Sequence, residues 1–141
     1  MFTKLLVAYD GSDGAERALR AGIDLAKSLG QDLYAVMVEE DLPHYAGTLD
    51  EVDAIKEQKD AYFGQLSREA IALAECLGVA LHTEIIAGHE VGAIVEYVKK
   101  HGFNLLIVGK HGHSALYERV IGTTAHGIMS HSPCSVLVVV Q

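Results

Sequence analysis

Hydrophobic positions along the chain follow two alternating periods. Residues 4–9 form a continuous apolar run that closes in a turn, which is the pattern of a buried strand. From Ser12 or Asp13 onward, apolar residues recur every three or four positions until Gly30 stops the pattern. Asp13 and Glu16 have the spacing of a capping box. These features predict a strand followed by an amphipathic helix.

The same alternation continues to the end of the chain. Four further strands are predicted, at residues 32–38, 79–87, 104–108 and 135–140. Helices are expected between them, over residues 50–77, around Val91 to Val98, and near residues 123–131. Residues 39–53 are polar and are predicted to form a long loop. Because a helix over residues 50–77 would be about 42 Å long, its first part is expected to be irregular or to project from the domain.

Strands that alternate with helices predict an α/β fold, a doubly wound five-stranded parallel sheet with helices on both faces, as in Rossmann-like proteins. The third strand alternates apolar residues with polar His82 and Glu84, which is typical of an edge strand. The order 3-2-1-4-5 places it at an edge, whereas the flavodoxin-like order 2-1-3-4-5 would bury both polar residues. The first order is preferred, and residues 1–141 are expected to form one domain.

The order 3-2-1-4-5 has a switch point between the first and fourth strands, where ligands bind at the carboxyl ends of strands. Asp10 and Gly109 lie there. Gly109 is expected to let the chain turn sharply, Gly112 to let backbone approach a ligand, and Gly122 to present the first N–H groups of the next helix. The backbone N–H groups and hydroxyls of residues 123 and 124, which are both Thr, would supply an anion site.

Composition limits the classes of partner. The chain has 19 acidic and 11 basic residues and a formal charge of -8, so its field repels nucleic acid and anionic membranes. No apolar run approaches the roughly 18 residues of a membrane span, and the first residues lack the features of a signal peptide. A cytoplasmic location is therefore expected. Cys76 and Cys134 match neither a metal site nor a disulfide framework, and both are expected to be buried thiols.

Four segments together carry a resemblance to a known family. The segments "AYDGS", "LLIVGKHGHS", "GTTA" and "SPCSVLVV" resemble the universal stress protein family, in particular its nucleotide-binding branch. Gly109, Gly112, Gly122 and Thr123 fit the pattern G-x2-G-x9-G-[ST] of that branch without a gap. The resemblance covers essentially the whole chain. It implies the 3-2-1-4-5 sheet and binding of ATP, with Mg²⁺ or Mn²⁺ held through the phosphates.

The resemblance also assigns roles to particular residues. It implies that Ala8 flanks the adenine, that Asp10 lies near the ribose and metal, and that Val38 contacts the adenine. The phosphate loop would comprise Gly109, Gly112, Gly122 and Thr123. Thr124, inferred above as a further donor from its place at the start of the helix, follows this loop directly. The chain departs from the family pattern at two positions: Asn104 replaces the usual Asp, and Thr123 replaces the commoner Ser.

Simpler roles remain open for several of these residues. Asp10 could cap the following helix or turn. Histidines are frequent late in the chain, but with no Cys or carboxylate partner they favour exposed positions over a metal site; they are His111, His113, His126 and His131. No nucleophile is paired with a base and an orienting group, so an enzyme is not expected.

Three hypotheses follow. The first is a regulatory nucleotide-binding module in the stress response. The second is a slow ATPase or self-phosphorylating protein that uses Asp10, a divalent metal and Thr123 or Ser114 as acceptor. The third is a structural dimer that binds no nucleotide. A homodimer through the apolar edge of the fifth strand is expected in any case, and the sequence does not identify a downstream protein partner.

Overall fold

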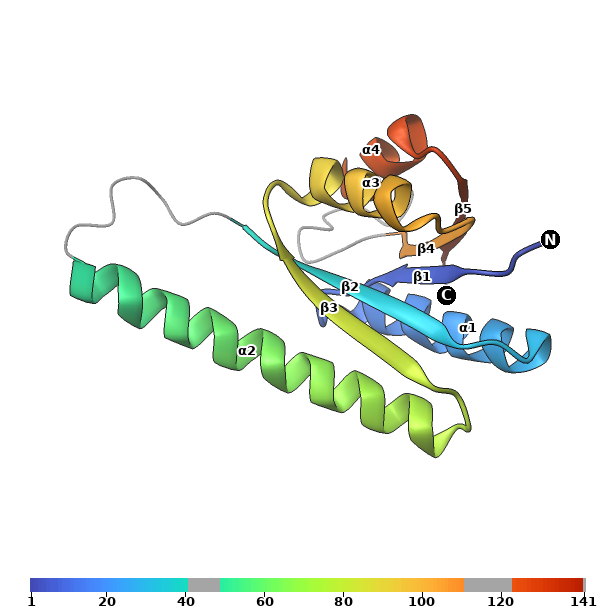
Figure 1. Ribbon diagram of the computed structural model, residues 1–141, viewed down its shortest axis with the longest axis horizontal. Coiled ribbons are helices and arrows are strands. Elements are labelled where there is room, and N and C mark those ends of the chain that lie inside the picture. Colours follow the sequence, from blue (N-terminus) through green and yellow to red (C-terminus); the bar gives the residue numbers. More distant parts are fainter. Residues whose placement is uncertain (41–48, 111–122, 141) are drawn as a thin grey trace.

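The computed structural model describes residues 1–40, 49–110 and 123–140, and its strands form one parallel sheet (Figure 1). Along the chain the strands are β1 (Leu5–Ala8), β2 (Leu33–Glu39), β3 (Leu81–Ala87), β4 (Leu105–Gly109) and β5 (Ser135–Val139). Their order in the sheet is β3-β2-β1-β4-β5, and every pairing is parallel. The fold class and strand order predicted from the sequence are therefore confirmed.

Helices cover both faces of this sheet. They are α1 (Asp13–Leu29), α2 (Leu49–Cys76), α3 (Glu90–His101) and α4 (Thr123–His131). Helices α1 and α2 lie on one face, and α3 and α4 lie on the other (Figure 1). Successive strand residues point to opposite faces, so Leu5 and Val7 pack toward α1, whereas Leu6 packs toward α3 and α4. Each face thus has its own hydrophobic core.

The polar positions of β3 explain its place at the edge. His82 and Glu84 are both exposed. The His82 ring lies 2.9 Å from the Asp32 carboxylate, and Glu84 accepts a hydrogen bond from the Tyr97 hydroxyl. By contrast, all four residues of β1 and the first four of β4 are apolar, because these strands lie inside the sheet. The edge position inferred from the alternation is confirmed.

Helix α1 begins and ends close to the predicted positions. Ser12 is the N-cap, and its hydroxyl accepts a hydrogen bond from the Ala15 N–H at 3.2 Å. Asp13 is the first helical residue and Glu16 the fourth, so the two do not form the capping box that their spacing predicted. The helix ends at Gly30, which adopts a left-handed φ of 65°.

Helix α2 is a continuous helix of 28 residues. Its first turns project past the edge of the sheet (Figure 1), so the projecting alternative is correct and the irregular one is wrong. The helix starts at Leu49 and β2 extends to Glu39, so the loop predicted over residues 39–53 is too long. Neither Gly nor Pro occurs between Leu49 and Phe63, so nothing local interrupts the helix.

Two other expectations can be compared with the structure. Cys76 is exposed and Cys134 is half-buried, so the expectation of buried thiols is wrong for both. Among the helices that the structure describes, none combines the length and the apolar character needed to cross a bilayer.

Candidate functional site

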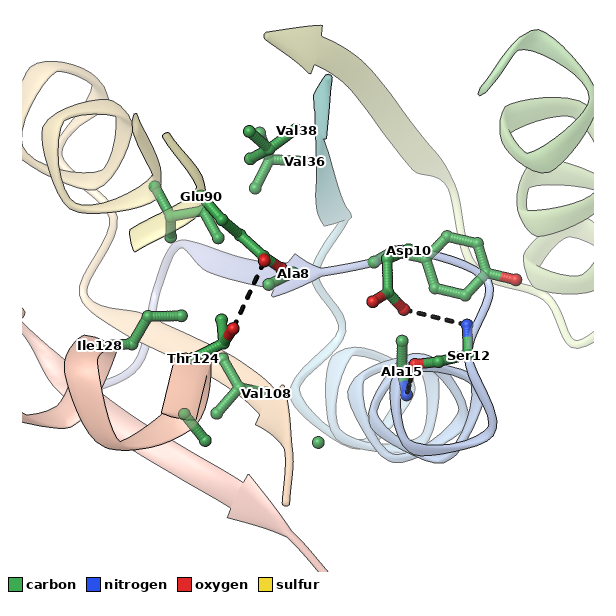
Figure 2. Close-up of a pocket in the computed structure, with 14 residues that line it drawn as sticks. Ala8, Asp10, Ser12, Ala15, Val36, Val38, Glu90, Val108, Thr124 and Ile128 are labelled. Carbon is green, nitrogen blue, oxygen red and sulfur yellow. Dashed lines mark hydrogen bonds between the residues drawn. The ribbon is translucent and has the colours of Figure 1, made fainter. Parts of the chain in front are cut away.

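A pocket opens where β1, β2 and β4 end, at the switch point of the sheet (Figure 2). The turn after β1 and helices α1, α3 and α4 contribute the rest of its described wall. The lining residues are Ala8, Tyr9, Asp10, Ser12, Ala15, Val36, Val38, Glu90, Ile94, Val108, Gly109, Thr124, Ala125 and Ile128.

Most of the wall is apolar. Val36, Val38 and Val108 come from strands, and they face the side of the sheet that α3 and α4 cover. Ile94 from α3 and Ile128 from α4 close the slot on that side. Ala8, at the end of β1, packs on the same side of the sheet, and its small side chain leaves room in the slot. Such a slot suits a flat apolar ring.

The backbone of β2 presents a polar edge beside this slot. The Val36 carbonyl accepts a hydrogen bond from the Tyr9 N–H at 3.0 Å, so it points toward β1. Backbone groups two residues apart on a strand point to the same side, so the N–H and C=O of Val38 also point toward β1. β1 has already ended at Ala8. The N–H and C=O of Val38 therefore face the space beyond the end of β1, next to the pocket.

The turn after β1 is held by several hydrogen bonds. The Asp10 carboxylate accepts one from the Ser12 N–H at 2.9 Å, and the Tyr62 hydroxyl donates to the Asp10 carbonyl at 3.3 Å. Gly11 adopts a φ of 80°, and a Cβ there would meet Leu66 Cδ2 at 2.8 Å. The capping role considered for Asp10 is thus present, since its carboxylate stabilises this turn, while the same side chain also lines the pocket.

Tyr9 lines the pocket, and its side chain is buried in the core on the side of α1 and α2. Its hydroxyl donates a hydrogen bond to Glu16 Oε2 at 2.9 Å, and Glu16 Oε1 lies 3.5 Å from Arg20 Nε. Burial, together with this hydrogen bond to a carboxylate, raises the pKa of Tyr9 well above its ordinary value. Tyr9 therefore stays protonated at neutral pH and serves as a fixed donor.

Glu90 brings a carboxylate into the apolar part of the pocket. It is the first residue of α3, and its side chain points toward Ala8 and Thr124 (Figure 2). The Thr124 hydroxyl, in the first turn of α4, donates to Glu90 Oε2 at 3.3 Å. This hydrogen bond connects the starts of α3 and α4 across the pocket.

The structure brings together most of the site residues predicted from the sequence that it describes. Ala8, Asp10, Val38, Gly109 and Thr124 all line the pocket. Thr123 is the first residue of α4, as expected, and its side chain lies outside the described part of the structure. Gly112 and Gly122 also lie outside the described residues.

The role predicted for Gly109 in turning the chain requires correction. Gly109 is the last residue of β4, and it is not among the glycines with positive φ in the described chain. A Cβ at this position would lie 2.5 Å from both the carbonyl carbon and the oxygen of Gly14. Gly109 is therefore required because the start of α1 packs directly on the end of β4.

Several lining residues were not identified from the sequence. The apolar ones, such as Val36, Val108 and Ile128, have the same pattern as ordinary core residues, so nothing distinguishes them. Glu90 could have been found, because it is an acidic residue that follows the carboxyl end of β3 by three positions. No group of three His, Cys, Asp or Glu residues able to hold a metal occurs in the part of the chain that the structure describes.

Comparisons with known proteins agree with this fold. The model of the universal stress protein family matches residues 1–140. The chain is 30% identical to universal stress protein YxiE of Bacillus subtilis, over 99% of each chain. It is 28% identical to a universal stress protein of Methanocaldococcus jannaschii, over 99% of this chain and 82% of the relative.

A solved structure gives the same result. The universal stress protein UspA from Lactobacillus plantarum superposes with a TM-score of 0.88 at 26% identity, over 98% of this chain and 97% of the other. The match of the family model over nearly the full length, the related sequences and the shared 3-2-1-4-5 sheet lead to one conclusion. The chain belongs to the universal stress protein family.

Proposed function

We propose that this protein is a regulatory module that binds ATP, with Mg²⁺ or Mn²⁺ held through the phosphates. The observation that carries the proposal is the pairing of an apolar slot with the backbone edge of Val38. Adenine is a flat ring that presents an acceptor nitrogen, N1, beside an amino group. The N–H and C=O of Val38 offer the complementary donor and acceptor.

The phosphate end of the ligand would lie toward α4. The first N–H groups of a helix and its dipole favour an anion, and Thr123 and Thr124 form the first turn of α4. The sequence pattern from Gly109 to Thr123 supports the same placement. An acidic protein of charge -8 needs such local donors to hold a triphosphate.

Binding of the metal would require the phosphates of the nucleotide as well as a carboxylate of the protein. Mg²⁺ commonly binds through one or two carboxylates and substrate phosphates. Asp10 lines the pocket and can supply one carboxylate, so the residues present fit a metal that arrives with the nucleotide. The metal would screen the phosphate charges from the acidic residues around the site.

Other proteins of the same fold support an adenine ligand. One is a universal stress protein in complex with cAMP, with a TM-score of 0.72 at 24% identity over 97% of this chain. Another is a universal stress protein family protein from Arabidopsis thaliana with AMP bound, with a TM-score of 0.70 at 18% identity over 97% of this chain. At these identities the likeness concerns the fold.

Binding without rapid turnover is part of the proposal. The described lining residues include no Lys, Arg or His, which are the side chains that stabilise charge on a transferring phosphoryl group. Release of phosphate under single-turnover conditions measures this directly. A protein that hydrolyses bound ATP within seconds would be an ATPase instead.

The first experiment is to identify small molecules released by denaturing freshly purified protein, using mass spectrometry. On nucleotide-free protein, ATP at one hundred times its dissociation constant should stabilise the fold by about 2.7 kcal/mol and raise the melting temperature by several degrees. Mg²⁺ should increase this shift. ITP, which replaces the adenine amino group by a carbonyl, should bind more weakly. The absence of any shift with millimolar ATP would overturn the proposal.

A variant tests the position of the base. Ala8→Leu should fill the slot, so affinity for ATP and for adenosine should both fall at least about tenfold, which is about 1.4 kcal/mol. Ala87→Leu is the matched control, because Ala87 is exposed at the end of β3 and lies outside the pocket. Calorimetry measures both affinities, and circular dichroism checks the fold. Unchanged binding by Ala8→Leu would place the base elsewhere.

A further inference from the structure

We propose that Glu90 sets the preference of this pocket between phosphate-bearing nucleotides and uncharged nucleosides. Its carboxylate competes with the phosphates for the hydroxyl of Thr124 and repels them. Glu90 therefore weakens the binding of ATP relative to adenosine. This inference rests on the proposed nucleotide site and names the residue that determines its charge selectivity.

The geometry around Glu90 carries the proposal. The carboxylate reaches into the slot over Ala8, among the apolar side chains of the wall (Figure 2). Glu90 Oε2 accepts a hydrogen bond from the Thr124 hydroxyl at 3.3 Å. Thr124 is the second residue of α4, the helix whose start would face the phosphates. The charge of Glu90 thus lies beside the anionic end of the proposed ligand.

The packing of α3 against α4 keeps the carboxylate in this position. Val91 follows Glu90 in α3, and Gly127 lies opposite it in α4. A Cβ on Gly127 would lie 3.0 Å from Val91 Cγ2, so the two helices are in close contact here. The backbone of Glu90 cannot withdraw far while this contact exists. A negative charge at the first position of a helix is also favourable to that helix.

Competition follows from the hydrogen-bonding capacity of the groups. A hydroxyl has one proton to donate, and both a carboxylate and a phosphate are acceptors. A phosphate can therefore accept the hydrogen bond of the Thr124 hydroxyl only when Glu90 no longer does. Repulsion between the two anions adds to this effect at separations of a few Å. Adenosine carries no phosphate, so neither effect acts on it.

The test compares Glu90→Gln with the unchanged protein. Glutamine keeps the size of the side chain and removes its charge, and its amide can turn toward a phosphate as a donor. The expected result is an affinity for ATP that rises roughly fivefold or more, while the affinity for adenosine changes less than about twofold. Isothermal titration calorimetry on nucleotide-free protein measures both, with AMP as a ligand of intermediate charge.

A matched control and a second variant separate charge from structure. Glu96→Gln removes the same charge from an exposed position on the same helix, and it should leave both affinities unchanged. Thr124→Val removes the contested hydroxyl. In a Thr124→Val background, Glu90→Gln should give a smaller gain for ATP than it gives alone. A gain of equal size in both backgrounds would overturn the competition for this hydroxyl.

The other possible results distinguish a failure of the role of Glu90 from a failure of the proposed function. Weaker or unchanged ATP binding by Glu90→Gln, with ATP still bound by the unchanged protein, overturns the role of Glu90 and leaves the proposed function in place. An equal rise for ATP and adenosine overturns the charge selectivity. If neither protein binds ATP or adenosine, the proposed function fails, and the role of Glu90 fails with it. Binding of ATP by Glu90→Gln alone supports both proposals.

Discussion

At the scale of single residues, the contact between Gly109 and Gly14 brings two backbone segments together at the edge of the pocket. Gly109→Ala would place a methyl group 2.5 Å from the Gly14 backbone, so α1 or β4 has to move. We expect a loss of roughly 1–3 kcal/mol in the free energy of unfolding. Urea denaturation followed by circular dichroism measures this loss.

The matched control for this variant is Gly92→Ala. Gly92 lies in α3 with nothing within 4 Å of its Cβ position, so alanine there should stabilise the protein by up to about 1 kcal/mol. The two substitutions are chemically identical and should have opposite signs. A Gly109→Ala variant as stable as the unchanged protein would mean that α1 and β4 separate easily.

The hydrogen bonds of the Asn104 side chain explain why this chain has Asn, and not the Asp of the family pattern, at this position. Its Oδ1 accepts hydrogen bonds from the N–H groups of Thr3 and Lys4 at 3.1 and 3.0 Å. Its Nδ2 donates to the Met1 carbonyl and to Thr3 Oγ1 at 3.1 and 3.0 Å. An amide is needed for this combination, because a carboxylate cannot donate.

Asn104→Asp should therefore destabilise this protein, although aspartate is the usual residue of the family at this position. The acceptor bonds survive, but the two donations are lost, and we expect a cost of about 1 kcal/mol in the free energy of unfolding. Thermal or urea unfolding at neutral pH measures it. Asn104→Ala, which loses all four bonds, should cost more. An Asn104→Asp variant as stable as the unchanged protein would show that the donations contribute nothing.

At the scale of elements, helix α2 differs from α1 in how it is supported. Helix α1 has buried residues along its length, from Gly14 to Ala26. In α2, the only described side chains that are buried are Ala70 and Ala74, both in the second half. The first half of α2 has hydrogen bonds from Lys59 to the Glu40 carbonyl and from Tyr62 to the Asp10 carbonyl, but no buried side chain among those described, so it depends mainly on its own hydrogen bonds and helix propensity.

Hydrogen exchange should reveal this difference. Amides in residues 53–62 of α2 should exchange at least roughly tenfold faster than those in residues 68–76, because local opening there breaks no core contact. Helix α1 is the internal control and should be slow throughout. Exchange measured by NMR or mass spectrometry gives the comparison. Equal protection along α2 would indicate that another surface covers its first half.

The elements also show how far the sequence could predict the structure. The periods of apolar residues identified every strand and helix of the described chain and, through His82 and Glu84, the strand order. The cap of α1 stayed open between Ser12 and Asp13 because both residue types are good caps, and only the backbone decides for Ser12. The contact between Glu90 and Thr124 could not be predicted, because the two residues are 34 positions apart in the sequence and only tertiary packing brings them together.

At the scale of the whole molecule, assembly remains a prediction. β5 lies at an edge of the sheet, and Leu137 on it is 39% exposed. An apolar edge of this kind pairs readily with a second copy. Val138 and Val139, which also lie on β5, pack against the two cores, so charges there would disturb the fold as well as the edge. Leu137 is the better position for a test.

Leu137→Lys should convert a homodimer into monomers in analytical ultracentrifugation at micromolar concentration. Leu29→Lys is the control, because Leu29 is 44% exposed and is the last residue of α1 and not part of the sheet edge. Two copies of charge -8 repel each other, so the dimer should also be stronger at higher salt. If the unchanged protein is already a monomer, the edge has no such partner.

The central place of β1 has a consequence for how the protein is made. Leu5 pairs with Leu33 of β2 on one side and with Leu105 of β4 on the other. A ribosome delivers the first partner early, but the second follows only after most of the chain has been synthesised. Until then, one side of a strand whose Leu5, Leu6 and Val7 are fully buried in the finished protein stays open. Nascent chains and fragments that end before β4 therefore expose an unpaired apolar strand edge that is prone to aggregation. Pairing of β4 with β1 covers this edge.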